Sequence, residues 1–258
     1  MSDNGQPIIE LRDVWKRFGR LEVLRGLSLR LEPGHTTVVI GESGTGKSVL
    51  LKHLVGLLRP DGGEVYFHGR RIDTMSEIEL VDVRRRFGFL FQGGALFDSL
   101  TVAENVAFPL VEHGRKPPAE IERIVEERLR MVGLDGLQAR KPAQLSGGQK
   151  KRVALARAIA LDPEVVLYDE PTTGLDPVRS DVINELILRL KQRLNVTGIV
   201  VTHDMTSAYK VADRIILLHE GRIVADGPPE LFRTSTDPQV RRFVDGRADE
   251  KDLSALNE

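Results

Sequence analysis

Short apolar runs alternate with amphipathic stretches along most of the chain. The runs at 36–40, 87–91, 165–169 and 197–202 are rich in β-branched, aliphatic and aromatic residues, as is typical of strands buried on both faces of a parallel sheet. Apolar residues recur at helical spacing between them, in the stretches 49–58, 76–86, 101–113, 118–132, 147–161 and 178–190. This alternation predicts an α/β fold.

Further strands are predicted near both ends of the chain, at 8–14, 21–32, 64–69, 213–218 and 222–226. A turn with two aromatics, Trp15 and Phe18, separates the first two. Two interpretations of this pair stay open. Either an aromatic ring stacks on a nucleotide base, or both rings cover the edge of the sheet.

A glycine-rich segment, GESGTGKS at 41–48, stands between the strand at 36–40 and the helix that follows. It fits G-x-x-x-x-G-K-[ST], in which backbone N–H groups cradle phosphates at a helix N-terminus. Lys47 would reach the β- and γ-phosphates, and the Ser48 hydroxyl would face Mg²⁺. The sequence therefore predicts a nucleotide site formed by Gly41, Glu42, Ser43, Gly44, Thr45, Gly46, Lys47 and Ser48.

A second possible anion-binding helix start lies about a hundred residues later, at LSGGQ (145–149). Ser146 is a plausible N-cap, and the two glycines after it let N–H groups face outward. A cap needs the serine, but not two exposed glycines and a glutamine. The segment is thus predicted to contact a ligand.

Polar residues follow three of the buried strands: Gln92, the pair Asp169 and Glu170, and His203. Open α/β sheets place ligand contacts at the carboxyl ends of strands. After a P-loop, Asp169 would hold Mg²⁺ and Glu170 would polarise the attacking water. A capping glutamine and a structural histidine are the alternatives for Gln92 and His203.

Composition narrows the classes of function. The 258 residues are 41% hydrophobic, and 37 basic residues stand against 38 acids, so no global basic field favours nucleic acid. The clusters 84–86 and 150–152 are interpreted as solvated helix faces. No cysteine is present, which excludes disulfides and thiolate metal sites. We expect no membrane span and no signal peptide, so any membrane role would need a partner.

Together these stretches resemble the ATP-binding subunit of ABC transporters over residues 8–235. Phe18 matches the A-loop aromatic, 41–48 Walker A, Gln92 the Q-loop and LSGGQ the signature. Residues 165–169 match Walker B with Glu170 next, 174–176 the D-loop and His203 the switch histidine. The resemblance implies a P-loop NTPase (RecA-like) core, an antiparallel β subdomain and a helical signature subdomain at roughly 93–160.

The resemblance also implies a head-to-tail dimer that holds two ATPs, each between one chain's P-loop and the other's signature. Glu170 would be the general base, His203 and Gln92 would sense the γ-phosphate, and Lys47 would assist. Mg²⁺ would be held by Ser48, Gln92 and Asp169. The residues acting in trans would be Leu145, Ser146, Gly147, Gly148, Gln149 and Asp176.

A finer resemblance, to the ATPases of MCE/Mla-type phospholipid transporters, rests on residues 91–102, 104–110 and 201–208. Many members of that group carry methionine as the fifth signature residue, whereas this chain has Gln149. The resemblance implies a permease, an MCE-domain lipid-binding protein and a small regulatory subunit as partners. The protein would sit on the cytoplasmic face of a membrane, that of the bacterial inner membrane, through its permease.

The exposed part of 93–110 is predicted to form the groove for the permease's coupling helix. The tail at 236–258 is predicted to contain a docked helix with Val240, Phe243 and Val244, followed by a frayed or partner-dependent end at 246–258. The ATPase of a small-solute importer remains an alternative, a soluble ABC ATPase acting on ribosomes or DNA lacks its usual extra modules, and a P-loop kinase would lack LSGGQ.

Overall fold

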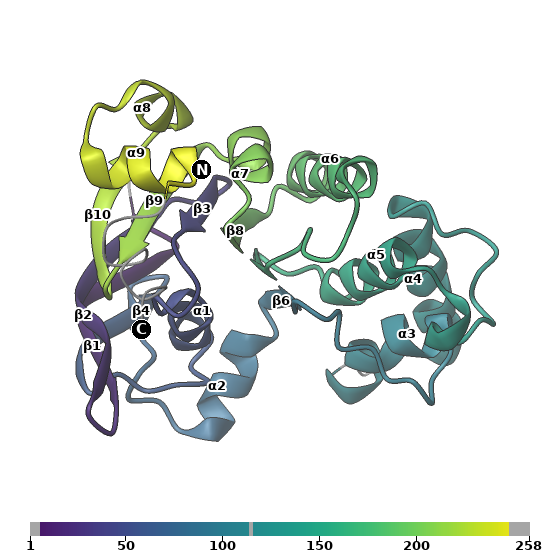
Figure 1. Cartoon of the computed structure of the whole chain (residues 1–258). Helices are drawn as coiled ribbons and strands as arrows, with labels where there is room; N and C mark the ends of the chain where they lie inside the picture. The colour runs from purple at the N-terminus through teal and green to yellow at the C-terminus, as the bar shows by residue number, and fades with distance from the viewer. Residues whose placement is uncertain (1–5, 114–115, 248–258) are drawn as a thin grey trace.

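A six-stranded sheet forms the centre of the computed structural model, which describes residues 6–113 and 116–247 (Figure 1). Its strand order is β10-β9-β3-β8-β7-β6, and all neighbours are parallel except β9 and β10. The strands are β3 (Thr36–Ile40), β6 (Phe87–Leu90), β7 (Val165–Asp169), β8 (Thr197–Thr202), β9 (Arg214–His219) and β10 (Arg222–Gly227).

The central sheet is buried on both faces, as its apolar runs predict. Val38 and Tyr168 belong to one hydrophobic cluster, whereas their neighbours Val39 and Leu167 belong to a second cluster. Successive side chains point to opposite faces of a strand, so the two clusters lie on opposite sides of the sheet. Each fully buried aliphatic side chain contributes about 1.5–3 kcal/mol to the free energy of folding, so the two clusters stabilise the sheet from both sides.

A four-stranded antiparallel sheet, ordered β2-β1-β4-β5, forms the left side of Figure 1. Its strands are β1 (Ile9–Phe18), β2 (Leu21–Leu31), β4 (Gly62–Phe67) and β5 (Arg70–Arg71). The predicted turn at 15–19 is wrong, because β1 continues to Phe18. Register shifts interrupt its pairing with β2 between Leu11 and Arg17, and such bulges hide a strand's alternation from a sequence pattern.

Helices α3 (Val102–His113), α4 (Pro118–Met131) and α5 (Gly147–Ala158) gather on the right side of Figure 1, with the short 3₁₀ helix η1 (Pro142–Gln144) before α5. These helices, which lie within residues 93–160, are called the helical part below. Arg128 of α4 is buried and donates from Nε to the Ile159 carbonyl at 3.1 Å, which ties α4 to the end of α5.

The other helices are α1 (Lys47–Leu54), α2 (Glu77–Arg84), α6 (Pro177–Leu194), α7 (Met205–Val211), α8 (Pro229–Thr234) and α9 (Pro238–Asp245). Helix α1 ends before the predicted 58, since Gly56 has a φ of 65° that a helix cannot contain. The predicted strand 87–91 ends at Leu90, and Phe91 beyond it is 40% exposed. The docked helix predicted in the tail is confirmed as α9, in which Val240 is buried.

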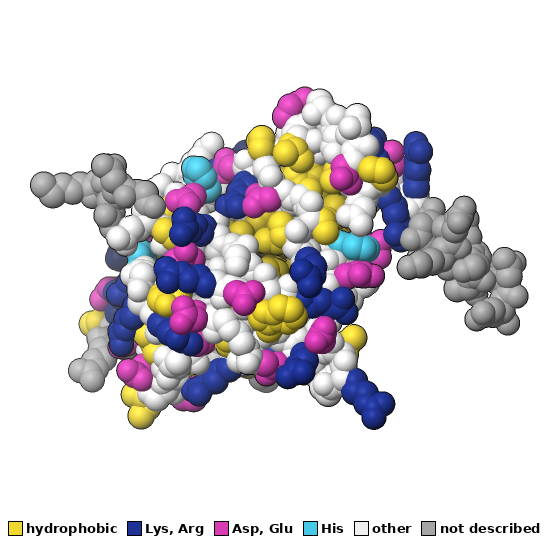
Figure 2. Space-filling view, turned by 90° about the vertical axis from the view of Figure 1, so that its left-hand side faces the viewer, with side chains coloured by type: hydrophobic (Ala, Val, Ile, Leu, Met, Phe, Trp, Pro, Cys, Tyr) yellow, Lys and Arg dark blue, Asp and Glu magenta, His cyan; other side chains and the backbone are white. Residues whose placement is uncertain are grey.

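The surface carries mixed charge. On the face over β1, β2 and β10, basic and acidic side chains alternate rather than gather by sign (Figure 2). Among the described helices, none combines the length and the apolar character that crossing a bilayer requires. The predicted frayed end lies mostly outside the described residues, which stop at Arg247.

Candidate nucleotide-binding and catalytic site

The P-loop joins the carboxyl end of β3 to the first turn of α1. Gly46 is the N-cap of α1 with φ 85°, and a Cβ there would come within 2.8 Å of the Val23 carbonyl oxygen. A Cβ on Gly41 would meet the Leu218 carbonyl oxygen at 2.4 Å. Both positions therefore require glycine, because neighbouring backbone fills the space that a side chain would need.

Lys47 lies folded back on its own loop. Its Nζ donates to the carbonyl oxygens of Gly41 at 2.9 Å and Glu42 at 3.2 Å, and lies 4.0 Å from Glu170 Oε1. Burial lowers the pKa of Lys47, although the carboxylates of Glu170 and Asp169 oppose this shift. A further anion, such as a phosphate, would stabilise the protonated form of an ammonium in this environment.

Ser48 and Asp169 meet across the sheet edge. The Ser48 hydroxyl donates to Asp169 Oδ1 at 3.2 Å, and burial raises the pKa of Asp169. A cation would stabilise this half-buried carboxylate, and hydroxyl and carboxylate oxygens are ligands that Mg²⁺ accepts. Among the described residues, no group of three or more His, Cys, Asp or Glu side chains is arranged so that it could hold a metal ion by itself. Mg²⁺ bound with phosphates needs only one or two protein carboxylates, so the residues present fit it.

Glu170 lies just past β7 in a left-handed conformation, with φ 49°. Its carboxylate accepts hydrogen bonds from Thr173 Oγ1 at 3.1 Å and Thr202 Oγ1 at 3.4 Å. His203 Nδ1 lies 3.0 Å from Glu170 Oε1. The carboxylate is thus held in one orientation by groups from β8 and from the turn after β7, a requirement for a general base.

Lys151 of α5 was missed by the sequence interpretation, which treated 150–152 as a solvated helix face. That interpretation is wrong for Lys151, which is 6% exposed and donates from Nζ to the carbonyl oxygens of Gln92 and, at 3.2 Å, Glu170. Burial lowers its pKa. Its spacing from the buried Gly148 and Leu155, three and four residues away, is the helical signal that could have found it.

The other basic cluster is likewise more than a solvated face. Arg84 donates from Nε to the Val55 carbonyl at 3.1 Å and from Nη2 to the Gly56 carbonyl at 2.9 Å. These carbonyls follow the last turn of α1, so Arg84 satisfies acceptors that the helix end leaves unpaired.

The signature segment is built as a capped helix start in the helical part. Ser146 N donates to Gln149 Oε1 at 2.9 Å, and Gln149 N donates to Ser146 Oγ at 3.3 Å, which forms a capping box. Asp176 is the N-cap of α6 and accepts from Arg179 N at 2.9 Å. Between described residues, no hydrogen bond or ion pair joins 145–149 to 41–48.

The two aromatics near the end of β1 differ. Trp15 donates from Nε1 to Asp13 Oδ1 at 3.2 Å and packs beside Gly26 and Gly62, as a residue covering the sheet does. Phe18 is 48% exposed, with Lys16 Nζ 5.5 Å from its ring centroid. Phe18 is therefore the aromatic available for stacking on a base. Gln92 is also exposed, two residues beyond β6, at the edge where β7 and β8 end.

The structure thus brings together Lys47, Ser48, Asp169, Glu170 and His203 at one sheet edge. The signature residues do not join them within the chain. A site of this kind can bind a polyphosphate at a helix N-terminus and activate water beside it.

Residues 24–173 match the family model described as ABC transporter. The chain is 42% identical to the intermembrane phospholipid transport system ATP-binding protein MlaF of Haemophilus influenzae, over 95% of this chain and 92% of that one. It is 43% identical to TRIGALACTOSYLDIACYLGLYCEROL 3, chloroplastic, of Arabidopsis thaliana (96% and 76%). It is 42% identical to the probable ribonucleotide transport ATP-binding protein mkl of Mycobacterium leprae (97% and 74%).

Solved structures agree. The dimeric structure of the ATP-binding cassette MJ0796 in a post-hydrolysis state, bound to ADP and Pi, is 34% identical with a TM-score of 0.79, over 86% of this chain and 98% of that one. CbiO1 of Clostridium perfringens, part of the ABC transporter complex cbiONQ, is 30% identical with a TM-score of 0.83, over 98% and 99%. The chain belongs to the ABC transporter family; it is an ATP-binding, ATP-hydrolysing subunit of such a transporter and has the P-loop NTPase fold.

Proposed function

We propose that this ATPase works as a head-to-tail dimer, with each ATP held between the P-loop of one chain and the signature segment of the other. Two features of the chain support this. It has one P-loop and one glycine-bearing helix start at 147, and no hydrogen bond between described residues joins them. A related cassette, MJ0796, is described as dimeric. Leu145, Ser146, Gly147, Gly148, Gln149 and Asp176 would then act across the dimer.

The catalytic proposal rests on the orientation of Glu170. Its carboxylate takes a proton from a water molecule as the water oxygen attacks the γ-phosphorus, and ADP leaves with its terminal oxygen. His203 and Gln92 sense the γ-phosphate from neighbouring strand ends. Lys47 turns from the loop carbonyls to the phosphates, where its charge is better satisfied.

Mg²⁺ belongs to the same proposal. Ser48, Asp169 and Gln92 would hold it, and the ion would neutralise charge on the phosphates. The remaining P-loop residues would bind the phosphates through backbone N–H groups, and Phe18 would stack on the base.

The transported substrate is proposed to be phospholipid or another lipid, moved by an MCE/Mla-type system. The observation that carries this is the 41–42% identity to MlaF proteins over nearly the whole of both chains. The protein would act at the cytoplasmic face of a bacterial inner membrane, with a permease, an MCE-domain protein and a small regulatory subunit. The name of mkl, a probable ribonucleotide transport protein, favours a small-solute system as the second candidate.

A groove in the helical part supports permease docking within 93–110. A cavity of about 510 Å³ opens between β6, α3 and the end of α5. Phe91, Phe97 and Phe108 line it, each about two-fifths exposed. Leu96 instead packs against the core, so Phe97 is the cleaner residue for a test. The domain proposal remains 8–235 for the ATPase, with the helical subdomain at roughly 93–160.

Purification of the tagged protein from its own membranes in mild detergent, followed by mass spectrometry of proteins and lipids, tests this proposal. A permease with an MCE-domain protein and phospholipid is the expected result. A permease with a solute-binding protein would remove the lipid and favour the second candidate. Recovery without any membrane protein would overturn the transport proposal.

A further inference from the structure

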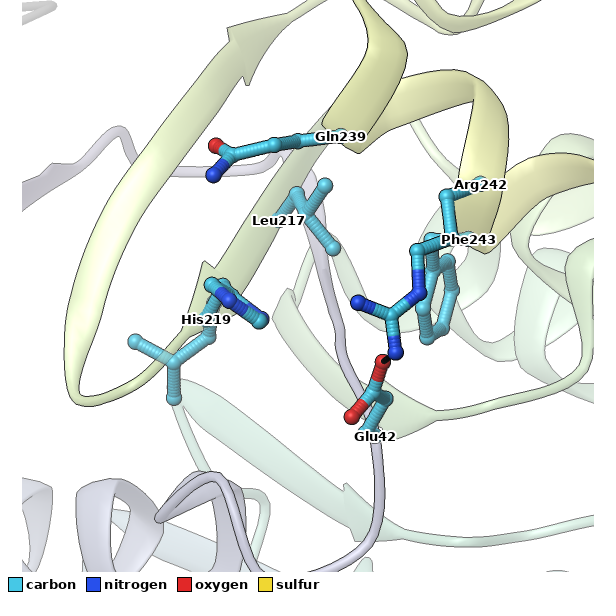
Figure 3. A pocket seen from close by; sticks show the side chains of 7 residues that line it. Glu42, Leu217, His219, Gln239, Arg242 and Phe243 are labelled. Carbon is cyan, nitrogen blue, oxygen red and sulfur yellow. Dashed lines mark ion pairs between the residues drawn. The ribbon is translucent and has the colours of Figure 1, made fainter. Parts of the chain in front are cut away.

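Helix α9 contacts the P-loop through an ion pair. Arg242 Nη2 of α9 lies 3.2 Å from Oε1 of Glu42, the second residue of the P-loop (Figure 3). The two residues are two hundred positions apart in sequence. The motif requires only the glycines, the lysine and the serine, so nothing in the motif itself accounts for a charge-pairing glutamate at position 42.

The position of Arg242 is fixed by the packing of its helix. Val240 is 3% exposed, and Phe243 and Val244 pack against the same core cluster that contains strand residues of β3 and β9. Asp237 caps the helix by accepting from Gln239 N at 2.8 Å. The guanidinium is therefore presented to the P-loop by a docked helix rather than by a free tail.

The junction between α9 and the P-loop is tight. A cavity of about 50 Å³ separates Glu42, the end of β9 at Leu217 and His219, and the α9 residue Gln239. Figure 3 shows the Glu42 carboxylate turned toward the guanidinium of Arg242. A space of this size holds water but no larger ligand, so the junction is a contact between two parts of the protein.

The orientation of Glu42 matters because its backbone already serves the nucleotide site. The Glu42 carbonyl accepts from Lys47 Nζ at 3.2 Å and from Thr45 Oγ1 at 2.9 Å. A Glu42 carboxylate that swung toward Lys47 would compete with phosphate for the ammonium and would repel the polyanion. The ion pair with Arg242 holds this carboxylate on the α9 side.

We propose that Arg242 is a positioning residue for nucleotide binding, which acts through Glu42. The docked helix α9 keeps the negative charge of Glu42 away from the phosphate cradle and so raises the affinity of the P-loop for nucleotide. A partner that drew α9 off the core would weaken nucleotide binding without touching the loop itself.

Equilibrium binding of the fluorescent nucleotide mant-ADP to the full chain tests this, because ADP occupies the P-loop and is not hydrolysed. We expect R242A to weaken binding about two- to five-fold, the range for a part-exposed ion pair. In an E42Q background, the same substitution should have little effect. The KM for ATP should change more than kcat.

Arg241 provides the matched control, since it is the adjacent residue of α9 and pairs with Asp245 rather than with the P-loop. R241A should leave mant-ADP binding unchanged. The R242A effect should also shrink at high salt, where part-exposed ion pairs are screened. Equal losses of mant-ADP affinity in R241A and R242A would show a general loosening of the tail and overturn the proposal. A loss of affinity from R242A that persists in the E42Q background would overturn it as well.

Discussion

His203 Nδ1 lies 3.0 Å from Glu170 Oε1, a contact that joins the carboxyl ends of the adjacent parallel strands β7 and β8. The two residues differ in environment, because the Glu170 side chain is 11% exposed and that of His203 is 60% exposed. The buried carboxylate is held in place, whereas the exposed imidazole has room to rotate toward the γ-phosphate in the proposed reaction. This asymmetry suits a fixed base and a mobile sensor.

Glu170→Gln should separate nucleotide binding from turnover. The amide keeps the size of the side chain but cannot take a proton from water, and general base catalysis contributes roughly 10²–10⁴-fold. We expect kcat to fall by at least about 100-fold while mant-ADP still binds. Steady-state ATPase assays and equilibrium binding measure the two effects.

Glu164→Gln is the control for this variant, because Glu164 stands at the opposite end of the same strand and pairs with His68 and Arg86 on the surface. It should hydrolyse ATP at the wild-type rate. A wild-type rate in E170Q would falsify the assignment of the base.

Lys151→Met tests the link between Gln92 and Glu170. The substitution keeps an apolar stem but removes the Lys151 donor to the Gln92 carbonyl and one of two donors to the Glu170 carbonyl, which also accepts from Thr173 N at 3.3 Å. A hydrogen bond to a charged group contributes about 1.5–3 kcal/mol. We expect a loss of that size in the free energy of unfolding, measured by urea denaturation, together with a lower kcat. Lys150→Met on the neighbouring half-buried position should change neither; equal losses in both variants would argue against the link.

Helical spacing could have indicated that Lys151 is buried, but its contacts mark the limit of what the sequence could predict. Local motifs identified the P-loop, the capped signature helix, and the strand ends at Asp169 and His203, because each depends on residues close together in the chain. The link from Lys151 to two loops depends on how α5 packs beside β6, and no local pattern reports that packing. The ion pair of Arg242 with Glu42 is hidden for the same reason.

The strands of the central sheet could be predicted from the sequence because both of their faces are buried. A strand buried on both faces must be apolar throughout, so its sequence is distinctive. Strand β1 was predicted too short because Asp13, with φ 49°, and the register shifts around it break the alternation. The Ser28 hydroxyl accepts from Asp13 N at 2.9 Å, and this contact between two strands joins residues fifteen positions apart in sequence, beyond the reach of a local pattern.

Nucleotide affinity should fall at alkaline pH through Lys47. Burial lowers the pKa of this lysine in the free protein, and bound phosphates raise the pKa again, because they favour the ammonium. Binding is therefore strongest below the lowered pKa and weakens as the pH rises through it. Titrations of mant-ADP from about pH 7.5 to about pH 10 measure this.

Lys47→Arg is the control for the pH series, since a guanidinium stays protonated over this range. Its affinity should be lower at neutral pH but nearly independent of pH. The same decline in K47R as in the wild type would assign the pH dependence to another group.

Mixing two inactive variants tests the head-to-tail dimer. Lys47→Ala disables the P-loop and Ser146→Arg disables the signature segment, so neither homodimer has an intact site. In a head-to-tail heterodimer, one site contains both defects and the other contains none. A random mixture should therefore recover about a quarter of wild-type ATPase activity, if the two sites of a two-fold dimer act independently.

A double variant with both substitutions, mixed with Lys47→Ala, provides the control, because none of its dimers has an intact site. If light scattering demonstrated dimers but the first mixture recovered no activity, the P-loop of one chain would not share a site with the signature segment of the other chain.

Phe97→Glu should disrupt permease docking. The Phe97 ring is 42% exposed and lies 4.6 Å from the ring of Phe108 within the aromatic groove. A carboxylate placed there would lose its water when an apolar helix docked, and burying a charge is costly. Arg157, 5.8 Å from the Phe97 ring, would offset only part of this cost. We expect the permease to be lost from the tagged protein in mild-detergent purification, while mant-ADP binding and the urea midpoint stay near wild type. Val111→Glu on the same helical part, at a residue 61% exposed and outside the groove, should retain the permease; retention by both variants would place the docking surface elsewhere.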